Sequence, residues 1–405
     1  HHRRLLCRKG RERSGSPENP SLYLGFLIYP LMKKSPILLA ALLTLAVILL
    51  AGCVQGRQPE GNMESVDLLT VSEPSLHDFF KQVEVIQLEG RDSAYLNTSC
   101  LSRYLVVEDR IFVMDRANQA IVVFDASGKW KETFRRYGRG PQEYVMMTDI
   151  AFNAGLQSLD VLEATGTILS YSLDPPHPMI RKIKIPDGVR AVNHFLPSGS
   201  GYYLFSGHEE SVLNYLDAES GTLTEVQGVP EVERNIRAGY ETSGSPLYTF
   251  AGQVHYVDGA SGRIFRLNGD QAVLHLGWDY GKYAFRPEVV DAERTAGPES
   301  YQTRLSASSS MAGPVSLTQE TERFVFTNVL FMKRWLNVVY DKETGAKTVF
   351  EKWKEGQMFS PGYPADQALY LLVPPEVSGQ FLLSGAEMPG ENANYLVLKY
   401  VLCNS

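Results

Sequence analysis

The chain has 405 residues, of which 44% are hydrophobic and 21% are charged, values close to the average of globular proteins. Its formal net charge is −7. A nucleic-acid-binding protein needs a basic stripe or patch to neutralise phosphates. No basic cluster with interleaved aromatic residues follows the N-terminal region, so the sequence predicts no nucleic-acid partner.

The N-terminal region is typical of an export signal. Residues 32–52 begin with Met32 and two lysines and continue as the apolar run SPILLAALLTLAVILLAG. This pattern indicates a secretory signal peptide, and a transmembrane helix is the alternative because the run is close to the minimum span. The run ends in LAGC, which resembles the bacterial lipobox and predicts Cys53 as the lipid-carrying first residue of the mature chain. More than one acyl chain would then give stable anchoring.

Two other segments lie outside the predicted domain. Residues 1–31 would bury the start of the signal, so we interpret them as an upstream extension from a start codon placed too early; a genuine basic extension is the alternative. Residues 53–75 are polar, with Pro and Gly, and predict a flexible tether. The pairing of Cys100 with Cys403 stays open, because the sequence does not give the distance between their Cα atoms.

Short strands dominate the rest of the chain. Residues 103–136 contain four of them, and the turn between the third and the fourth runs from Asp125 to Gly128. The Asp side chain can bond to the backbone of such a turn, and Gly accepts a positive φ. The same meander recurs at 149–185, 192–227, 247–278 and 323–353. The intervals are about 40 to 50 residues, with longer insertions before the fourth and fifth copies, and this spacing is typical of propeller blades.

Strands are left over at both ends of this repeat. One run at 83–89 precedes it, and runs at 368–375 and 394–402 follow it. A propeller often closes its ring with an N-terminal strand, because closure leaves no open sheet edge. The sequence therefore predicts an all-β, six-bladed β-propeller over residues 76–405, with four-stranded antiparallel blades and an N-terminal strand that pairs with C-terminal strands. Five and seven blades are the alternatives.

Helical signals are few. Residues 74–83 place apolar side chains at helical spacing after Ser75, which is a candidate N-cap. Residues 286–307 predict a second short helix, in an insertion before the fifth repeat.

Two windows of the sequence carry a family resemblance. The stretch IFVMDRANQAIVVFDASGKWKETFRRYGRGPQEY at 111–144 and the stretch ENANYLVLKY at 391–400 resemble the six-bladed β-propeller lipoproteins of Bacteroidetes, relatives of NHL-type propellers. The chain departs from the family pattern at Gln142, where a Gly is expected, and at Ala393, where a Pro is expected. The resemblance implies the fold but no activity, because propellers include lyases, lactonases, lectins and scaffolds.

The stretch FRRYGRGPQEY at 134–144 is the first candidate site. It links the last strand of the first repeat to the first strand of the second, and should run from the rim of the ring toward the mouth of its channel. Arg139, Gln142, Glu143 and Tyr144 are therefore candidate ligand-binding residues. In the alternative interpretation, Arg139 pairs with Glu143 to lock two blades while Tyr144 packs between them.

Catalytic and metal-binding patterns are weak. The chain has no His-Glu-x-x-His, no Gly-x-Ser-x-Gly, no P-loop and no zinc-ligand spacing. Polar residues near the predicted inner strands are scattered in sequence: Asp149, Asn153, His194 and Asn328. No cofactor or metal is therefore predicted, with calcium in the channel as the alternative.

Aromatic residues offer a second candidate site. The run GWDYGKYAF at 277–285 leaves a predicted strand, so Trp278, Tyr280 and Tyr283 are the candidates for stacking on sugar rings. Packing in the core between sheets is the alternative.

These observations predict an exported, monomeric binding module rather than an enzyme. The lipid on Cys53 would anchor it to the outer membrane, on the periplasmic face or the cell surface; the absence of an early acidic run after Cys53 favours the periplasmic face. Its ligand would be a glycan, a peptide or a partner protein. The alternatives are an envelope hydrolase or lyase with a metal in the channel, and a scaffold of an envelope complex.

Overall fold

The computed structural model describes residues 61–91, 94–97, 103–206, 211–228, 245–286, 309–313, 315–382 and 394–403. The chain divides into two compact units, His1–Glu60 and Gly61–Ser405, and the description below concerns the second. The predicted upstream extension, the signal peptide, Cys53 and Cys100 lie outside the described residues. In the described ranges, no helix has the length and hydropathy of a membrane span.

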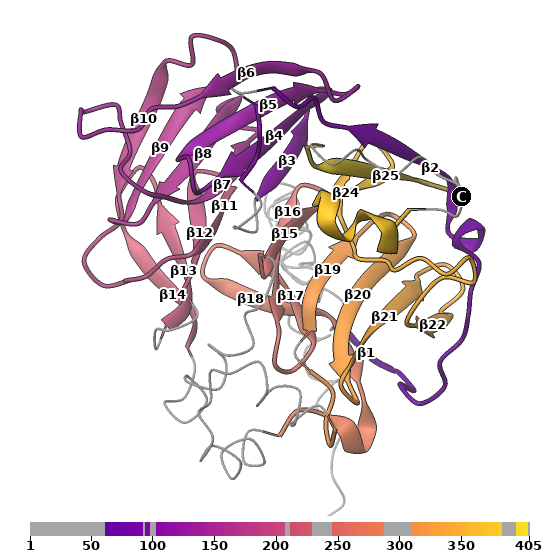
Figure 1. Ribbon diagram of the computed structural model, residues 1–405. Coiled ribbons are helices and arrows are strands. Elements are labelled where there is room, and N and C mark those ends of the chain that lie inside the picture. Colours follow the sequence, from indigo (N-terminus) through magenta and orange to yellow (C-terminus); the bar gives the residue numbers. More distant parts are fainter. Residues whose placement is uncertain are drawn as a thin grey trace, which may run out of the picture. The chain divides into compact units, whose positions relative to one another are not determined.

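Six antiparallel four-stranded meanders follow one another along the chain and form a ring (Figure 1). Blades one and two are β3 (Tyr104–Val107), β4 (Arg110–Asp115), β5 (Ala120–Asp125) and β6 (Trp130–Phe134), then β7 (Met147–Asn153), β8 (Ser158–Glu163), β9 (Thr167–Ser172) and β10 (Met179–Lys184). Blades three and four are β11 (His194–Ser198), β12 (Gly201–Phe205), β13 (Ser211–Asp217) and β14 (Leu223–Gly228), then β15 (Leu247–Phe250), β16 (Gln253–Asp258), β17 (Arg263–Asn268) and β18 (Gln271–Asp279).

Blade five is β19 (Val315–Glu320), β20 (Phe324–Phe331), β21 (Arg334–Asp341) and β22 (Lys347–Phe350). Blade six combines β23 (Tyr363–Ala365), β24 (Ala368–Val373) and β25 (Leu396–Leu402) with the N-terminal strand β2 (Phe80–Gln87). The prediction of six blades, with a ring closed by an N-terminal strand, is therefore confirmed. Short 3₁₀ turns are η2 (Leu76–Asp78), η3 (Gly281–Tyr283) and η5 (Pro375–Gln380).

The first strand of each blade lies on the inside of the ring. Strands β3, β7, β11, β15, β19 and β23 each contact the next, and β23 contacts β3. The inner strands of a propeller run in one direction around its axis. The connectors that lead into them therefore share one face of the ring, here called the entry face, and the strands end toward the opposite exit face.

Ring closure rests on β2. It pairs antiparallel with β25, from Phe80 opposite Leu402 to Gln87 opposite Leu396. Phe80 is fully buried, and its ring centroid lies 5.2 Å from that of Tyr400 and 5.6 Å from that of Phe326 in blade five. The closing strand thus supplies both hydrogen bonds to blade six and an aromatic contact to blade five.

The predicted turns have the expected chemistry. In blade one, Asp125 Oδ1 accepts hydrogen bonds from the backbone N–H groups of Ser127 and Lys129. Gly128 follows at φ +84°, and a Cβ there would lie 2.3 Å from the carbonyl oxygen of Gln87. Gly128 is therefore required both by the turn and by the close approach of the closing strand.

The packed part of the chain begins earlier than the predicted boundary at residue 76. Strand β1 (Asn62–Ser65) pairs in parallel with the outer strand β18, and Val66 and Leu68 are buried between blades four and five. The segment 53–75 thus contains a fifth strand for blade four and two core residues. The apolar residues of this segment are too few and too isolated in the sequence to predict a strand. Strand β1 forms because the edge of β18 supplies its hydrogen-bonding partners.

Two other expectations differ from the structure. The helical spacing after Ser75 produces a single turn, η2, capped by Ser75, after which Phe80 begins β2; Leu76 and Phe80 reach the same core from a turn and a strand. The repeat expected at 323–353 contains only three strands of blade five, since its inner strand β19 lies before it. The helix expected at 286–307 falls almost entirely outside the described residues.

Replacement of Phe80 tests whether the core contact of β2 stabilises the ring. Phe80→Ala removes a fully buried ring and should lower the free energy of unfolding by about 3–5 kcal/mol. Val85→Ala, on an exposed position of the same strand, should change it by less than about 0.5 kcal/mol. Urea unfolding followed by circular dichroism measures both. Equal losses would show that the core contact of β2 does not stabilise the ring.

Candidate functional site

The stretch 134–144 forms the corner between blades one and two on the entry face. It leaves β6 at Phe134, and the chain enters β7 at Met147. The backbone N–H of Gly138 donates to the carbonyl oxygen of Tyr144 at 3.0 Å, and that of Tyr144 donates to the carbonyl of Arg136 at 2.9 Å. These two bonds hold the outgoing and returning arms of the corner side by side.

Tyr144 locks the corner. Its side chain is fully buried in the core between blades one and two, where burial raises its pKa to about 12. The hydroxyl donates to the carbonyl oxygen of Gln119 at 3.1 Å and accepts from the backbone N–H of Arg136 at 3.2 Å. Its ring and hydroxyl are thus engaged in the fold.

Glu143 braces the same loop from outside. Its Oε2 accepts a hydrogen bond from the backbone N–H of Gly140 at 2.7 Å, and a Cβ on Gly138 would lie 2.0 Å from that oxygen. Among the described residues no ion pair joins Glu143 to Arg139, so the brace is a carboxylate–backbone bond. The side chains of Arg139 and Gln142 are exposed, and the backbone carbonyl of Gln142 accepts from the Tyr171 hydroxyl at 3.0 Å.

Apolar side chains are exposed beside these polar ones. Tyr137, Val145 and Met146 are 52%, 38% and 49% exposed, and they are three of the nine large hydrophobic residues with such exposure in the described ranges. The guanidinium of Arg135 lies 5.3 Å from the centre of the Tyr137 ring. We call Arg135, Tyr137, Arg139, Val145 and Met146 the corner patch.

Of the four polar candidates near the inner strands, the structure brings together Asp149 and His194, while Asn153 and Asn328 have other partners. Asp149 is buried and binds Arg103 Nε at 3.3 Å, His194 Nδ1 at 3.4 Å and the backbone N–H of Phe195 at 3.2 Å. It therefore links blade two to blades one and three. Asn153 bonds instead to Asp160, and Asn328 bonds to Asn337 in blade five.

The aromatic candidates lie mainly in the core. Trp278 and Tyr280 are buried between blades four and five, where burial raises the pKa of the Tyr280 hydroxyl. Tyr283 packs edge-on against Phe331 at 4.9 Å between ring centroids. In this structure the rings of Trp278 and Tyr280 fill the core and have no face open to a sugar.

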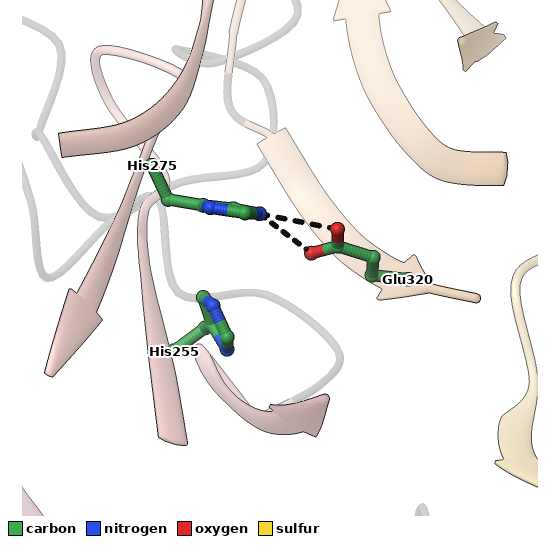
Figure 2. Close-up of side chains that lie close together, drawn as sticks. All are labelled: His255, His275 and Glu320. Carbon is green, nitrogen blue, oxygen red and sulfur yellow. Dashed lines mark hydrogen bonds and ion pairs between the residues drawn. The ribbon is translucent and has the colours of Figure 1, made fainter. Parts of the chain in front are cut away.

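A histidine–carboxylate cluster that the sequence did not indicate lies between blades four and five. His255 of β16, His275 of β18 and Glu320 of β19 each offer a ligand atom, all within 4.8 Å of one another (Figure 2). His275 Nε2 lies 3.1 and 3.0 Å from the two carboxylate oxygens of Glu320. In the part of the chain that the structure describes, this is the one such group of three His, Cys, Asp or Glu residues.

A β-bulge places His275. Strand β18 pairs Leu274 with Phe265 and Leu276 with Ile264, so His275 is an extra residue without a partner on β17. Bulges redirect a side chain out of strict alternation. Figure 2 shows the His275 ring directed at Glu320, with His255 beside them. On the side of β18 that faces β1, the backbone N–H of Gly61 donates to the carbonyl oxygen of Leu274 at 3.0 Å.

Burial and neighbouring groups shift the pKa values of two residues of this cluster, His255 and Glu320. Burial, and then the neighbouring His275, lower the pKa of His255 to about 4, so that its ring is neutral at neutral pH. Burial raises the pKa of Glu320, but hydrogen bonding and charge from His275 and Lys342 outweigh it and hold that pKa below its usual range. Glu320 also accepts from the Tyr248 hydroxyl at 2.9 Å and from Lys342 Nζ at 3.1 Å.

No pattern in the sequence predicts this cluster, and the reason is physical. Its residues are separated by 20 and 45 positions (275 − 255 and 320 − 275), and they lie on three strands of two blades. Only the bulge at position 275, which no short motif announces, turns the second ring toward the carboxylate.

Substitutions at the corner separate the residues that brace it from those that do not. Glu143→Ala removes the bond to Gly140 and should cost about 1 kcal/mol of unfolding free energy. Arg139→Ala should change it by less than about 0.5 kcal/mol. Gly138→Ala, which displaces the Glu143 carboxylate, should be harmful alone and nearly neutral in the Glu143→Ala background. Thermal and urea unfolding measure these values, and a loss for Arg139→Ala as large as for Glu143→Ala would make Arg139 part of the brace.

Comparison with known proteins agrees with the fold. The chain is similar to a presumed exported protein of Bacteroides fragilis, at 15% identity and a TM-score of 0.68, over 85% of this chain and 100% of that one. A member of the DUF4221 family from Bacteroides vulgatus matches at 9% identity and a TM-score of 0.49, over 80% and 98%. No curated protein matches the sequence. The family model described as a domain of unknown function, DUF4934, matches residues 63–376, and the chain therefore belongs to the DUF4934 family.

Proposed function

We propose that this propeller is an exported, lipid-anchored binding module whose corner patch binds an acidic segment of a partner protein. The observation that carries the proposal is the exposure of Tyr137, Val145 and Met146 next to arginine side chains on a braced loop. Tyr, Met and Arg are enriched in protein interfaces. Tyr and Arg combine apolar area with hydrogen-bond donors, and Met adds flexible apolar area. A loop held by Tyr144 and Glu143 also loses little conformational freedom on binding.

Charge favours an acidic partner. The corner carries Arg135, Arg136 and Arg139 against Glu143 alone, while the whole chain has a formal net charge of −7. A guanidinium binds a carboxylate through two parallel hydrogen bonds, which gives both attraction and orientation. A local basic patch on an acidic protein would direct an acidic segment to this site.

The same residues favour a polypeptide over a glycan. Sugar rings stack on exposed aromatic faces, and of the three aromatic candidates Trp278 and Tyr280 are buried in the core. The corner patch contributes one exposed aromatic ring and two aliphatic side chains, Val145 and Met146. This composition suits a peptide that carries an apolar side chain between carboxylates.

The anchor is the second part of the proposal. The lipobox-like sequence before Cys53 supports lipidation, and the family resemblance agrees with it. Seven residues lie between Cys53 and Gly61, where the described chain begins, and the eight Cα–Cα steps between them span at most about 28 Å when fully extended. Such a short tether would keep the propeller at the surface of the outer membrane.

Peptide binding tests the recognition surface. Fluorescence anisotropy of a labelled peptide, with glutamates on both sides of one phenylalanine, should report saturable binding to the full chain in detergent. Arg139→Glu should weaken binding at least about tenfold, which corresponds to the loss of one charge-assisted hydrogen bond. Arg263→Glu, an exposed arginine of blade four, serves as the matched control and should have no effect. Equal weakening by both variants, or binding to a glycan array with none to the peptide, would refute the proposed surface.

Lipidation is tested by labelling in cells. With an alkyne analogue of palmitate, the wild-type chain should be labelled and sediment with membranes. Cys53→Ser should abolish both, because Cys53 is the proposed acceptor of the acyl chains. Cys403→Ser, a half-buried free thiol of the propeller, should keep the label. A labelled Cys53→Ser variant would contradict the anchor.

A further inference from the structure

We propose that His255, His275 and Glu320 form a binding site for a divalent transition-metal ion, with zinc as the best match. Two imidazoles and one carboxylate are a ligand set that zinc uses in open sites, where water completes the coordination. Borderline metals of this kind prefer imidazole, whereas calcium and magnesium prefer oxygen ligands only. The site lies between blades four and five, with Glu320 at the end of the inner strand β19 and the two histidines on β16 and β18 of blade four.

The spacing of the ligand atoms fits one ion. All three atoms lie within 4.8 Å of one another. Ligand atoms around a tetrahedral zinc with bonds of about 2.0–2.2 Å are about 3.3–3.6 Å apart, so small side-chain rotations would complete the site. The hydrogen bond between His275 Nε2 and Glu320 joins two of these ligands, and an ion would replace its proton.

Supporting groups orient two of the ligands. His255 Nδ1 lies 3.2 Å from the carbonyl oxygen of Gln253, an arrangement that puts the proton on Nδ1 and leaves Nε2 as the lone-pair donor. Tyr248 stacks on the His255 ring, at 5.1 Å between centroids and 14° between planes, and donates its hydroxyl to Glu320. Metal-binding histidines and carboxylates characteristically have such partners.

Among the described lysines and arginines, Lys342 is the one that contacts the Glu320 carboxylate and would compete with an ion for it. Its Nζ lies 3.1 Å from Glu320 Oε1, but it also donates to the carbonyl oxygen of Thr321 and lies 4.2 Å from the centre of the Phe250 ring. The side chain is 24% exposed, so it can keep these other contacts when an ion takes its place on Oε1. The side chain of His275 is 28% exposed and gives an ion a route from solvent.

A second buried carboxylate shows what a structural contact between blades looks like here. Asp160 of blade two accepts hydrogen bonds from Ser158, Asn153 and Tyr202. Its partners are hydroxyl and amide groups, and no imidazole takes part. Asp149 has a single imidazole partner, His194, beside an arginine. Glu320 has a tyrosine contact like that of Asp160 but lies with two histidines, one of them redirected by a bulge, a pair of imidazoles that neither Asp149 nor Asp160 has.

The experiment measures zinc affinity of the full chain in detergent, by competition with a chromogenic chelator, and the visible spectrum of the cobalt-loaded protein. We expect one ion per chain and a cobalt spectrum with nitrogen ligands. H255Q and H275Q should each weaken zinc binding by at least the factor of about 10–100 that loss of a supporting group produces. K342M should tighten binding, because it removes the competing charge.

A matched control comes from blades one and two. His177 pairs with Glu132 at 3.1 Å without a second histidine, so H177Q should leave the zinc affinity unchanged. Circular dichroism checks the fold of every variant. If H255Q fails to fold, K342M decides: tighter zinc binding supports the site, and unchanged or weaker binding overturns it. Wild-type affinity no higher than that of the H255Q/H275Q double variant would also overturn the proposal.

Discussion

The antiparallel pairing of β2 with β25 is the contact on which the rest of the propeller depends. It joins residues more than 300 positions apart, including an ion pair between Glu84 and Lys399 at 3.2 Å. Without it, β25 would present an open edge and blades five and six would lose the aromatic contact through Phe80. Because the six inner strands are positioned only by a closed ring, both the corner between blades one and two and the cluster between blades four and five depend on this pairing.

Buried carboxylates are a second recurring device of the ring. Asp149 links blades one, two and three, Asp160 links blades two and three, and Glu320 links blades four and five. A buried carboxylate is tolerated when it is fully hydrogen-bonded. Asp149 meets that condition with arginine, histidine and backbone partners, and Asp160 meets it with hydroxyl and amide partners. Glu320 meets it with tyrosine, lysine and histidine, of which the last two can also exchange with an ion.

The corner patch and the histidine–carboxylate cluster lie toward opposite faces of the ring. The corner lies where the chain enters the inner strand β7, on the entry face, whereas Glu320 ends the inner strand β19 toward the exit face. Occupation of one site therefore does not block the other. A partner could be held at the entry face while an ion strengthens the contact between blades four and five, and the two proposals stand or fall independently.

The sequence predicted what local chemistry determines. Alternating runs and turns such as the one from Asp125 to Gly128 were sufficient for the blade count and for placing 134–144 at a corner. The separate roles of the residues in that corner were not predictable. Tyr144 is buried, Glu143 accepts a backbone hydrogen bond, and Arg139 is exposed. The path of the loop determines these differences.

Contacts between strands that lie far apart in the sequence could not be predicted from it. Strand β1 needs the edge of β18, and the cluster needs the bulge that turns His275. Neither has a sequence pattern of its own. The aromatic residues Trp278 and Tyr280 failed as surface candidates for the opposite reason, since a strand end that looks exposed in the sequence is covered by blade five.

Hydrogen exchange of the full chain, followed by mass spectrometry with and without the acidic peptide, locates the surface that the peptide binds. The peptide should slow exchange in residues 134–146 and leave the strands of blades four and five unchanged. Slower exchange confined to another blade, with none at the corner, would contradict the proposed surface.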